Sequence, residues 1–189
     1  MEAFLISAGL VAVAEIGDKT QLLAILLATR FRKPIPIIAG IFVATIANHA
    51  LAAWAGSLLS GFLDGKILLW VLAVSFVAMA IWALIPDKDD ENAAPVAAGS
   101  VFLATTIAFF LVEMGDKTQV ATAALGARFE NVAVVAAGTT LGMMIANVPA
   151  VFLGDTVLKF APLHLVRYAA AAIFAALAIA TILSALAIG

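Results

Sequence analysis

Six long apolar stretches take up almost the whole of this 189-residue chain. A helix needs about 20 residues to cross the hydrocarbon core of a bilayer, and all but the third stretch are longer than that. The chain is 65% apolar and only 12% charged, which leaves too little polar surface to cover a soluble globule. We therefore expect an all-α integral membrane protein with six transmembrane helices, within residues 3–29, 34–60, 67–85, 99–127, 132–158 and 165–189.

A charged motif interrupts two of these stretches. Residues 15–21 read EIGDKTQ and residues 113–119 read EMGDKTQ, each time in the middle of an apolar run. A charge at the centre of a bilayer costs about 2.5 to 3.5 kcal/mol even on the most permissive insertion scales. Three charges in each copy therefore predict an ion pathway through the membrane.

The chain is a duplication. Glu113 and Phe174 lie 98 positions after Glu15 and Phe76, and Asn147 lies 99 positions after Asn48, which implies a one-residue insertion. We expect a first three-helix repeat over residues 1–85, a linker over 86–98 and a second repeat over 99–189. Because three is an odd number of crossings, the second repeat must enter from the opposite side. Inverted repeats with polar breaks near the midplane are typical of secondary transporters.

The distribution of basic residues predicts the orientation, because cytoplasmic connections are enriched in Lys and Arg. The connections after the first, third and fifth stretches hold six such residues, against two on the other side. This count places the linker in the cytoplasm and both termini outside. The N-terminus lacks the positive start of a secretory signal, so the first stretch should remain in the mature protein. The basic residues counted are Arg30, Arg32, Lys33, Lys88, Lys159 and Arg167, against Lys66 and Arg128.

The chemistry of the motif favours a hard divalent cation. On a continuous helix, Glu15 and Asp18 would share one face, and a glycine between them would weaken the helix locally. Carboxylate, amide and hydroxyl oxygens suit Mn²⁺ or Ca²⁺, and the sequence leaves the choice between them open. The expected metal ligands are Glu15, Asp18, Gln21, Glu113, Asp116 and Gln119, with Asn48 and Asn147 as further candidates; the expected supporting residues are Gly17, Lys19, Thr20, Gly115, Lys117 and Thr118.

Charge balance predicts proton exchange. Four carboxylates against Lys19 and Lys117 leave two negative charges, which one divalent ion would neutralise. When the ion leaves, the carboxylates cannot all stay ionised, so some should take up protons. The lysines could limit the repulsion, or pair with Glu15 and Glu113 at i, i+4. A purely structural role as interhelical salt bridges is the alternative, but it would not require Gly, Thr and Gln to recur as well.

Four further polar residues lie in the second and fifth stretches or near the sixth. Asn48 and Asn147 could complete a cation shell or simply tie helices together. His49 could be a nitrogen ligand or proton relay, but Val148 stands at the matching position, so we expect an ordinary polar contact. We expect His164 to lie solvated in a loop.

The paired E-x-G-D-K-T motifs in a duplicated six-span chain resemble the Gdt family of cation/proton exchangers, which includes Golgi calcium and manganese transporters and bacterial manganese exporters. The resemblance covers the whole chain. It implies a divalent cation transporter with Glu15, Asp18, Glu113 and Asp116 as metal-binding carboxylates, a cytoplasmic central loop and a place in the cell membrane of a prokaryote.

Other functions fit the sequence less well. An exporter of small organic cations or amino acids would need an apolar or aromatic pocket with fewer carboxylates, and a cation channel would not couple to protons. An enzyme is not expected, because no cysteine, no HExxH motif and no Ser, His and Asp set is present. A net charge of −2 with scattered basic residues argues against a nucleic-acid partner. No cofactor is expected; the partners are the cation, protons and the lipid bilayer.

Overall fold

The secondary structure of the protein is helical in a computed structural model that describes residues 1–85, 100–154 and 163–188. This confirms the all-α prediction for the described residues. The expected linker at 86–98 and Lys159 lie outside them. The helices are α1 (Glu2–Glu15), α2 (Lys19–Phe31), α3 (Pro34–Phe62), α4 (Gly65–Ala83), α5 (Val101–Glu113), α6 (Lys117–Phe129), α7 (Val132–Leu153) and α9 (Leu163–Ala187).

Four of these helices are long and apolar enough to cross a membrane, namely α3, α4, α7 and α9, and α5 is a shorter apolar helix. Their first residues lie within two positions of the predicted starts of the corresponding stretches. Large apolar side chains such as Trp54 and Phe62 are exposed on the outside of the bundle, as expected of a surface that faces lipid. The described part of the chain is that of a multi-pass membrane protein.

The first and fourth apolar stretches differ from the others, because each forms two short helices in place of one long helix. The chain leaves the helix after Glu15 and again after Glu113, at matching points of the motif. Gly17 and Gly115 both have a φ of 79°, a left-handed conformation that glycine adopts without steric cost. The predicted local break is therefore confirmed in both copies. The expectation that Glu15 and Asp18 share one helix face is wrong, since the turn separates them.

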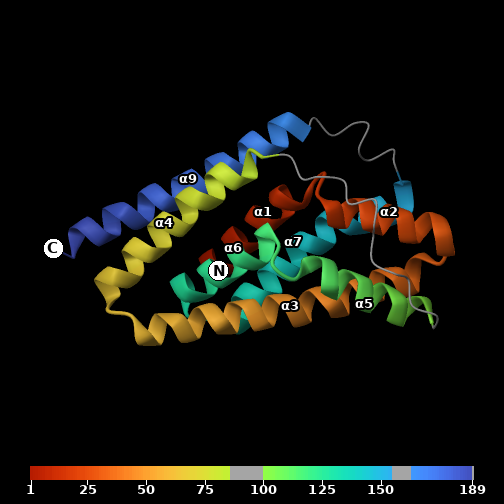
Figure 1. Cartoon of the computed structure of the whole chain (residues 1–189), viewed down its shortest axis with the longest axis horizontal. Coiled ribbons are helices and arrows are strands. Elements are labelled where there is room, and N and C mark those ends of the chain that lie inside the picture. The colour runs from red at the N-terminus through yellow and green to blue at the C-terminus, as the bar shows by residue number, and fades with distance from the viewer. Residues whose placement is uncertain (86–99, 155–162, 189) are drawn as a thin grey trace.

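Helices from the two halves of the sequence pack closely against each other. Figure 1 shows the red α1 beside α7 and the green α5 beside α3, and these pairs are in direct contact. A Cβ on Gly138 of α7 would lie 2.7 Å from the Phe4 carbonyl oxygen of α1. A Cβ on Gly40 of α3 would lie 2.9 Å from the Phe102 carbonyl oxygen of α5. Both contacts are related by 98 positions (138 minus 40, and 102 minus 4), so the duplication in the sequence is also present in the packing.

Matching helices of the two halves run in opposite directions. In Figure 1, α3 along the lower edge and α7 through the middle run in opposite directions, and α4 runs antiparallel to α9 along one side of the bundle. Phe76 of α4 and Phe174 of α9 are both fully buried in the same apolar core. Beside this core the first break is partly buried, whereas Gly115 in the second break is exposed and the flanking Glu113 and Asp116 are buried.

The left-handed turn at Gly115 can be tested without disturbing side-chain packing, because no heavy atom lies within 4 Å of a Cβ built there. We expect Gly115→Ala to destabilise the protein by about 1 to 2 kcal/mol, since alanine pays the steric cost of the left-handed backbone. Thermal unfolding in detergent should show a Tm lower by about 2 to 8 °C.

The matched control is Gly9→Ala, which lies within α1 with equally open space around it. Alanine is the better helix former there, so the Tm should stay the same or rise. An unchanged Tm for Gly115→Ala would contradict the left-handed turn.

Candidate metal centre

The two helix breaks bring three carboxylates together in the interior. Glu15 and Glu113 are the last residues of α1 and α5, and Asp116 directly precedes α6. All three are buried, and each offers a carboxylate oxygen within 4.8 Å of the other two. Ligand oxygens about 2.2 to 2.5 Å from one cation lie no more than about 5 Å apart. The group therefore has the dimensions of a divalent cation site made from both copies of the motif.

Glutamine side chains hold the shape of both breaks. The N–H of Gly17 donates to Gln21 Oε1 at 2.8 Å, and the N–H of Gly115 donates to Gln119 Oε1 at 2.6 Å. Gln21 Nε2 also donates to the carbonyl of Ala146 in α7, at 2.9 Å. The expected ligands Gln21 and Gln119 thus use their amide oxygens to satisfy the backbone that the left-handed glycines expose.

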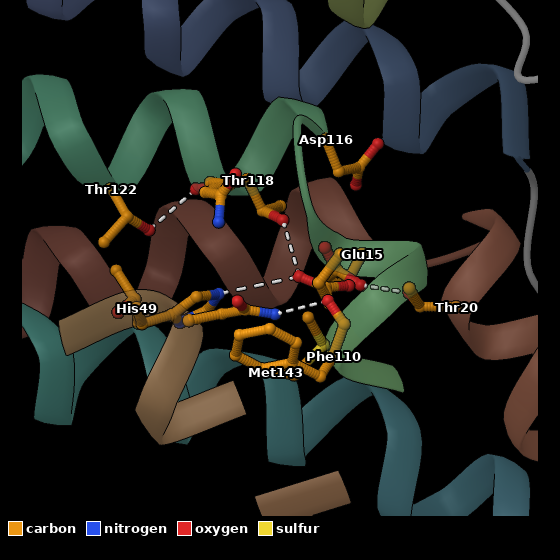
Figure 2. A network of polar contacts seen from close by, with 12 residues as sticks. Glu15, Thr20, His49, Phe110, Asp116, Thr118, Thr122 and Met143 are labelled. Atoms are coloured by element: carbon orange, nitrogen blue, oxygen red, sulfur yellow. Dashed lines mark hydrogen bonds and ion pairs between the residues drawn. The ribbon is translucent and has the colours of Figure 1, made fainter. Parts of the chain in front are cut away.

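Threonine hydroxyls hold one oxygen of each glutamate. Thr20 Oγ1 donates to Glu15 Oε2 at 2.6 Å, whereas Thr118 Oγ1 is 3.4 Å from Glu113 Oε2 (Figure 2). Thr122 in turn donates to the backbone carbonyl of Thr118 at 2.7 Å. These threonines orient the carboxylates and leave the other oxygen of each glutamate available.

The remaining carboxylate oxygens have no hydrogen-bond donor among the described residues. They are Oε1 of Glu15, Oε1 of Glu113 and Oδ2 of Asp116, all fully buried. A buried charged oxygen without a partner is costly, because it has lost its water and gained nothing in return. Three such oxygens in one group are what a bound cation would satisfy.

The lysines of the two motifs lie in different surroundings. Lys19 Nζ forms a salt bridge with Asp116 Oδ1 at 3.0 Å, so it joins the first motif to the second. Lys117 Nζ donates to the carbonyl of Ile85, after the end of α4, at 3.3 Å. Of the two roles predicted for the lysines, pairing with the glutamate of the same motif is not what Lys19 shows, since its salt bridge is to Asp116 of the other motif.

Asp18, the fourth expected carboxylate, is buried but does not belong to this group. It lies in the wall of a small cavity of about 30 Å³, whose lining also includes Lys117 and Arg167. Leu163, at the start of α9, covers the adjacent Gly17 closely. The two aspartates of the duplicated motif thus occupy different environments in this structure.

Asn48 and Asn147 each use their amide nitrogen to fix a neighbouring backbone. Asn48 Nδ2 donates to the carbonyl of Phe110 in α5 at 3.0 Å, and Asn147 Nδ2 donates to the carbonyl of Met143 at 3.1 Å. Their amide oxygens are buried without a hydrogen-bond donor among the described residues. Both amide oxygens therefore remain candidate ligands.

His49 is closer to the centre than the sequence indicated. Its Nε2 lies 3.7 Å from Glu113 Oε2, and both side chains are fully buried (Figure 2). The polar contact that we expected exists, but it is made to a candidate metal ligand. The only signal in the sequence was the position of His49 next to Asn48. His164 was expected in a loop; it lies in the first turn of α9, where it is exposed.

Comparison with known proteins identifies the family. Residues 3–91 and 101–188 match the family model of the divalent cation/proton antiporter GDT1. The chain belongs to this family. A protein of Vibrio cholerae serotype O1 (strain ATCC 39541 / Classical Ogawa 395 / O395) with the name "Putative manganese exporter" is 53% identical over 182 residues, which cover 96% of this chain and 90% of that protein. No solved structure matches the chain.

Membership of the GDT1 family confirms the resemblance seen in the motifs. It also confirms a membrane transporter of divalent cations as the function. Since the family is one of antiporters, the expectation that the protein is not an enzyme is confirmed as well.

The unequal threonine contacts predict unequal effects of mutation. Thr20→Val removes a 2.6 Å hydrogen bond to Glu15, whereas Thr118→Val removes a weaker one of 3.4 Å. Valine keeps the shape of threonine. A hydrogen bond to a charged group contributes about 1.5 to 3 kcal/mol. We expect Thr20→Val to weaken the apparent metal affinity at least tenfold, and Thr118→Val to have a smaller effect. Metal flux measured against metal concentration gives both values, and equal effects would contradict the geometry.

Proposed function

We propose that the protein exports Mn²⁺ across the cell membrane in exchange for protons, by alternating access around the site formed by both motifs. The observation that carries the proposal is the group of three buried carboxylates, Glu15, Glu113 and Asp116, which comes from both halves of the chain. The choice of manganese is supported by the name of the Vibrio cholerae relative and by the oxygen-rich ligand set, which suits Mn²⁺.

The charge of the site supports a divalent cargo and proton exchange. Three carboxylates against the ammonium group of Lys19 leave two negative charges, which one divalent cation neutralises. Two like charges about 4 Å apart repel by about 4 kcal/mol even at an effective dielectric constant of about 20. The empty site therefore needs positive charge from another source, and protons are the natural replacement.

We assign the ligand roles as follows. Glu15, Glu113 and Asp116 bind the ion directly, and the amide oxygens of Asn48 and Asn147 complete its shell. Gln21 and Gln119 hold the breaks open, Thr20 and Thr118 orient the glutamates, and Lys19 keeps Asp116 in place. Asp18 takes the place of Asp116 in the opposite conformation, in which the two motifs exchange roles.

The two motifs can exchange roles if the chain crosses the membrane six times as two inverted repeats. The two broken helices are each interpreted as one crossing, α1 with α2 and α5 with α6, which restores three crossings to each half. The opposite directions of α3 and α7 and the paired contacts of Gly40 and Gly138 support the inversion. Inverted repeats allow the two faces of a transporter to open in turn around one fixed site.

We further propose that both termini lie outside the cell and that the linker at 86–98 lies in the cytoplasm. The proposal is supported by the excess of Lys and Arg on the side of the linker. In this orientation the cavity beside Asp18 lies at the linker end of α4, since Met79 and Ala83 line it. That end would face the cytoplasmic supply of metal.

The site carboxylates can be tested by neutral substitution. Glu113→Gln keeps the shape of the side chain but removes a charge that the cation needs. We expect Mn²⁺ flux in proteoliposomes to fall at least tenfold, with the Tm of the purified protein unchanged or raised, since buried repulsion is relieved. Asp116→Asn should lower the flux alike, but it also removes the salt bridge to Lys19, so no rise in its Tm is expected. Glu2→Gln is the matched control, because Glu2 is exposed at the N-terminus, and it should keep wild-type flux. Wild-type flux in Glu113→Gln would remove this residue from the site.

Proton coupling requires a separate experiment. In proteoliposomes loaded with acidic buffer, protons leaving the vesicle should drive the accumulation of Mn²⁺ against its gradient. A protonophore added together with a potassium ionophore should abolish the accumulation. A cation channel would pass Mn²⁺ only down its electrochemical gradient, with no accumulation driven by pH. An exporter of organic cations or amino acids would carry those compounds in the same vesicles and leave Mn²⁺ outside.

A further inference from the structure

The buried imidazole of His49 lies beside the metal centre and has no role in the function proposed so far. His49 lies in α3, its side chain is fully buried, and its Nε2 is 3.7 Å from Glu113 Oε2. This distance is too long for a hydrogen bond. Neither ring nitrogen of His49 has a hydrogen-bond partner among the described residues. A fully desolvated imidazole without a partner is costly unless something else satisfies its nitrogen.

We infer that His49 Nε2 is a ligand of the transported ion, which makes the site a mixed carboxylate and imidazole site selective for first-row transition ions over Ca²⁺. The inference rests on the proposed function and explains how the site would select Mn²⁺ over Ca²⁺. Two ligands about 2.1 to 2.2 Å from one ion lie between about 3.0 and 4.3 Å apart, depending on the angle between them. His49 lies beside the group of three carboxylates and is not a member of it, but the 3.7 Å between its Nε2 and Glu113 Oε2 falls inside this range. An ion bound by both would use the Glu113 oxygen that Thr118 contacts only weakly, at 3.4 Å.

The surroundings of His49 favour a ligand over a packing role. The neighbouring Asn48 donates to the carbonyl of Phe110, three residues before Glu113, and so fixes α3 against the end of α5 (Figure 2). This contact holds the imidazole at a fixed distance from the Glu113 carboxylate. The imidazole nitrogen and the Thr118 hydroxyl thus lie near the same oxygen of Glu113, Oε2, at 3.7 and 3.4 Å.

The chemistry of the nitrogen ligand determines which ions gain from it. Ca²⁺ binds oxygen ligands almost exclusively. Manganese and iron both accept histidine beside glutamate in carboxylate-rich helical bundles. An imidazole therefore adds affinity for Mn²⁺ and Fe²⁺ and adds little for Ca²⁺. Because Val148 stands at the matching position of the second half, only one such nitrogen is present, and it comes from α3.

A spectroscopic test can be made on the wild-type protein. The chain contains only two histidines, His49 and the exposed His164. Pulsed electron paramagnetic resonance of the Mn²⁺-loaded protein, with ¹⁵N-labelled histidine, should show coupling of the metal to one histidine nitrogen. The coupling should disappear in His49→Gln and persist in His164→Gln, the matched control. Absence of histidine coupling in the Mn²⁺-loaded wild type would overturn the inference, even if the variants fail to fold.

Transport selectivity gives a second test. We expect His49→Gln and His49→Leu to lower the ratio of Mn²⁺ to Ca²⁺ uptake at least tenfold in competition experiments, whereas His164→Gln should leave it unchanged. An unaltered ratio in folded His49 variants would overturn the inference. If the wild-type protein moved no Mn²⁺ at all, the proposed function would be wrong. The coupling between bound Mn²⁺ and a histidine nitrogen is measured without transport, so it would still test the inference about His49.

Discussion

Negative charge crowded into a protein interior is the constraint on which the rest of this structure depends. Three carboxylates lie within 4.8 Å of one another without access to water. One lysine, two threonines and two glutamines are arranged around them, either as counter-charge, as hydrogen-bond donors or as supports of the backbone. Such an arrangement is stable only when positive charge is supplied, and the supply of that charge is what a cation/proton antiporter controls.

Much of the metal centre could be predicted from the sequence, because the features that form it lie within a few residues of one another in each motif. Charges inside apolar stretches are rare enough to identify the functional segment, and a glycine between two carboxylates predicts an interruption of the helix. The ends of α1 at Glu15 and α5 at Glu113 follow directly from that glycine. The duplication, read as a constant separation along the chain, likewise predicts that matching contacts such as those of Gly40 and Gly138 occur in pairs.

The remaining features depend on tertiary structure that no short pattern contains. A continuous helix would have placed Glu15 and Asp18 on one face, but the chain turns at Gly17. Because the same turn at Gly115 leaves Asp116 beside Glu113, the turn alone does not exclude Asp18 from the group. The packing around each motif decides this, and it also brings Lys19 to Asp116. The sequence pattern alone favours no role for His49 in the site, because Val148 stands at the matching position. In an asymmetric ligand shell, however, the absence of a counterpart is no argument against a role, and only the position of α3 against α5 places the imidazole beside Glu113.

The paired glycine contacts have a mechanical consequence. Gly138 joins α7 to α1 and Gly40 joins α3 to α5, and at each glycine a backbone carbonyl and a small side chain of the neighbouring helix lie too close to admit a Cβ. A hinge placed between the two sequence halves would have to pull both seams apart in every cycle. Rigid bodies that kept both seams intact would each contain helices of both halves, so their boundary would differ from the boundary between the two repeats.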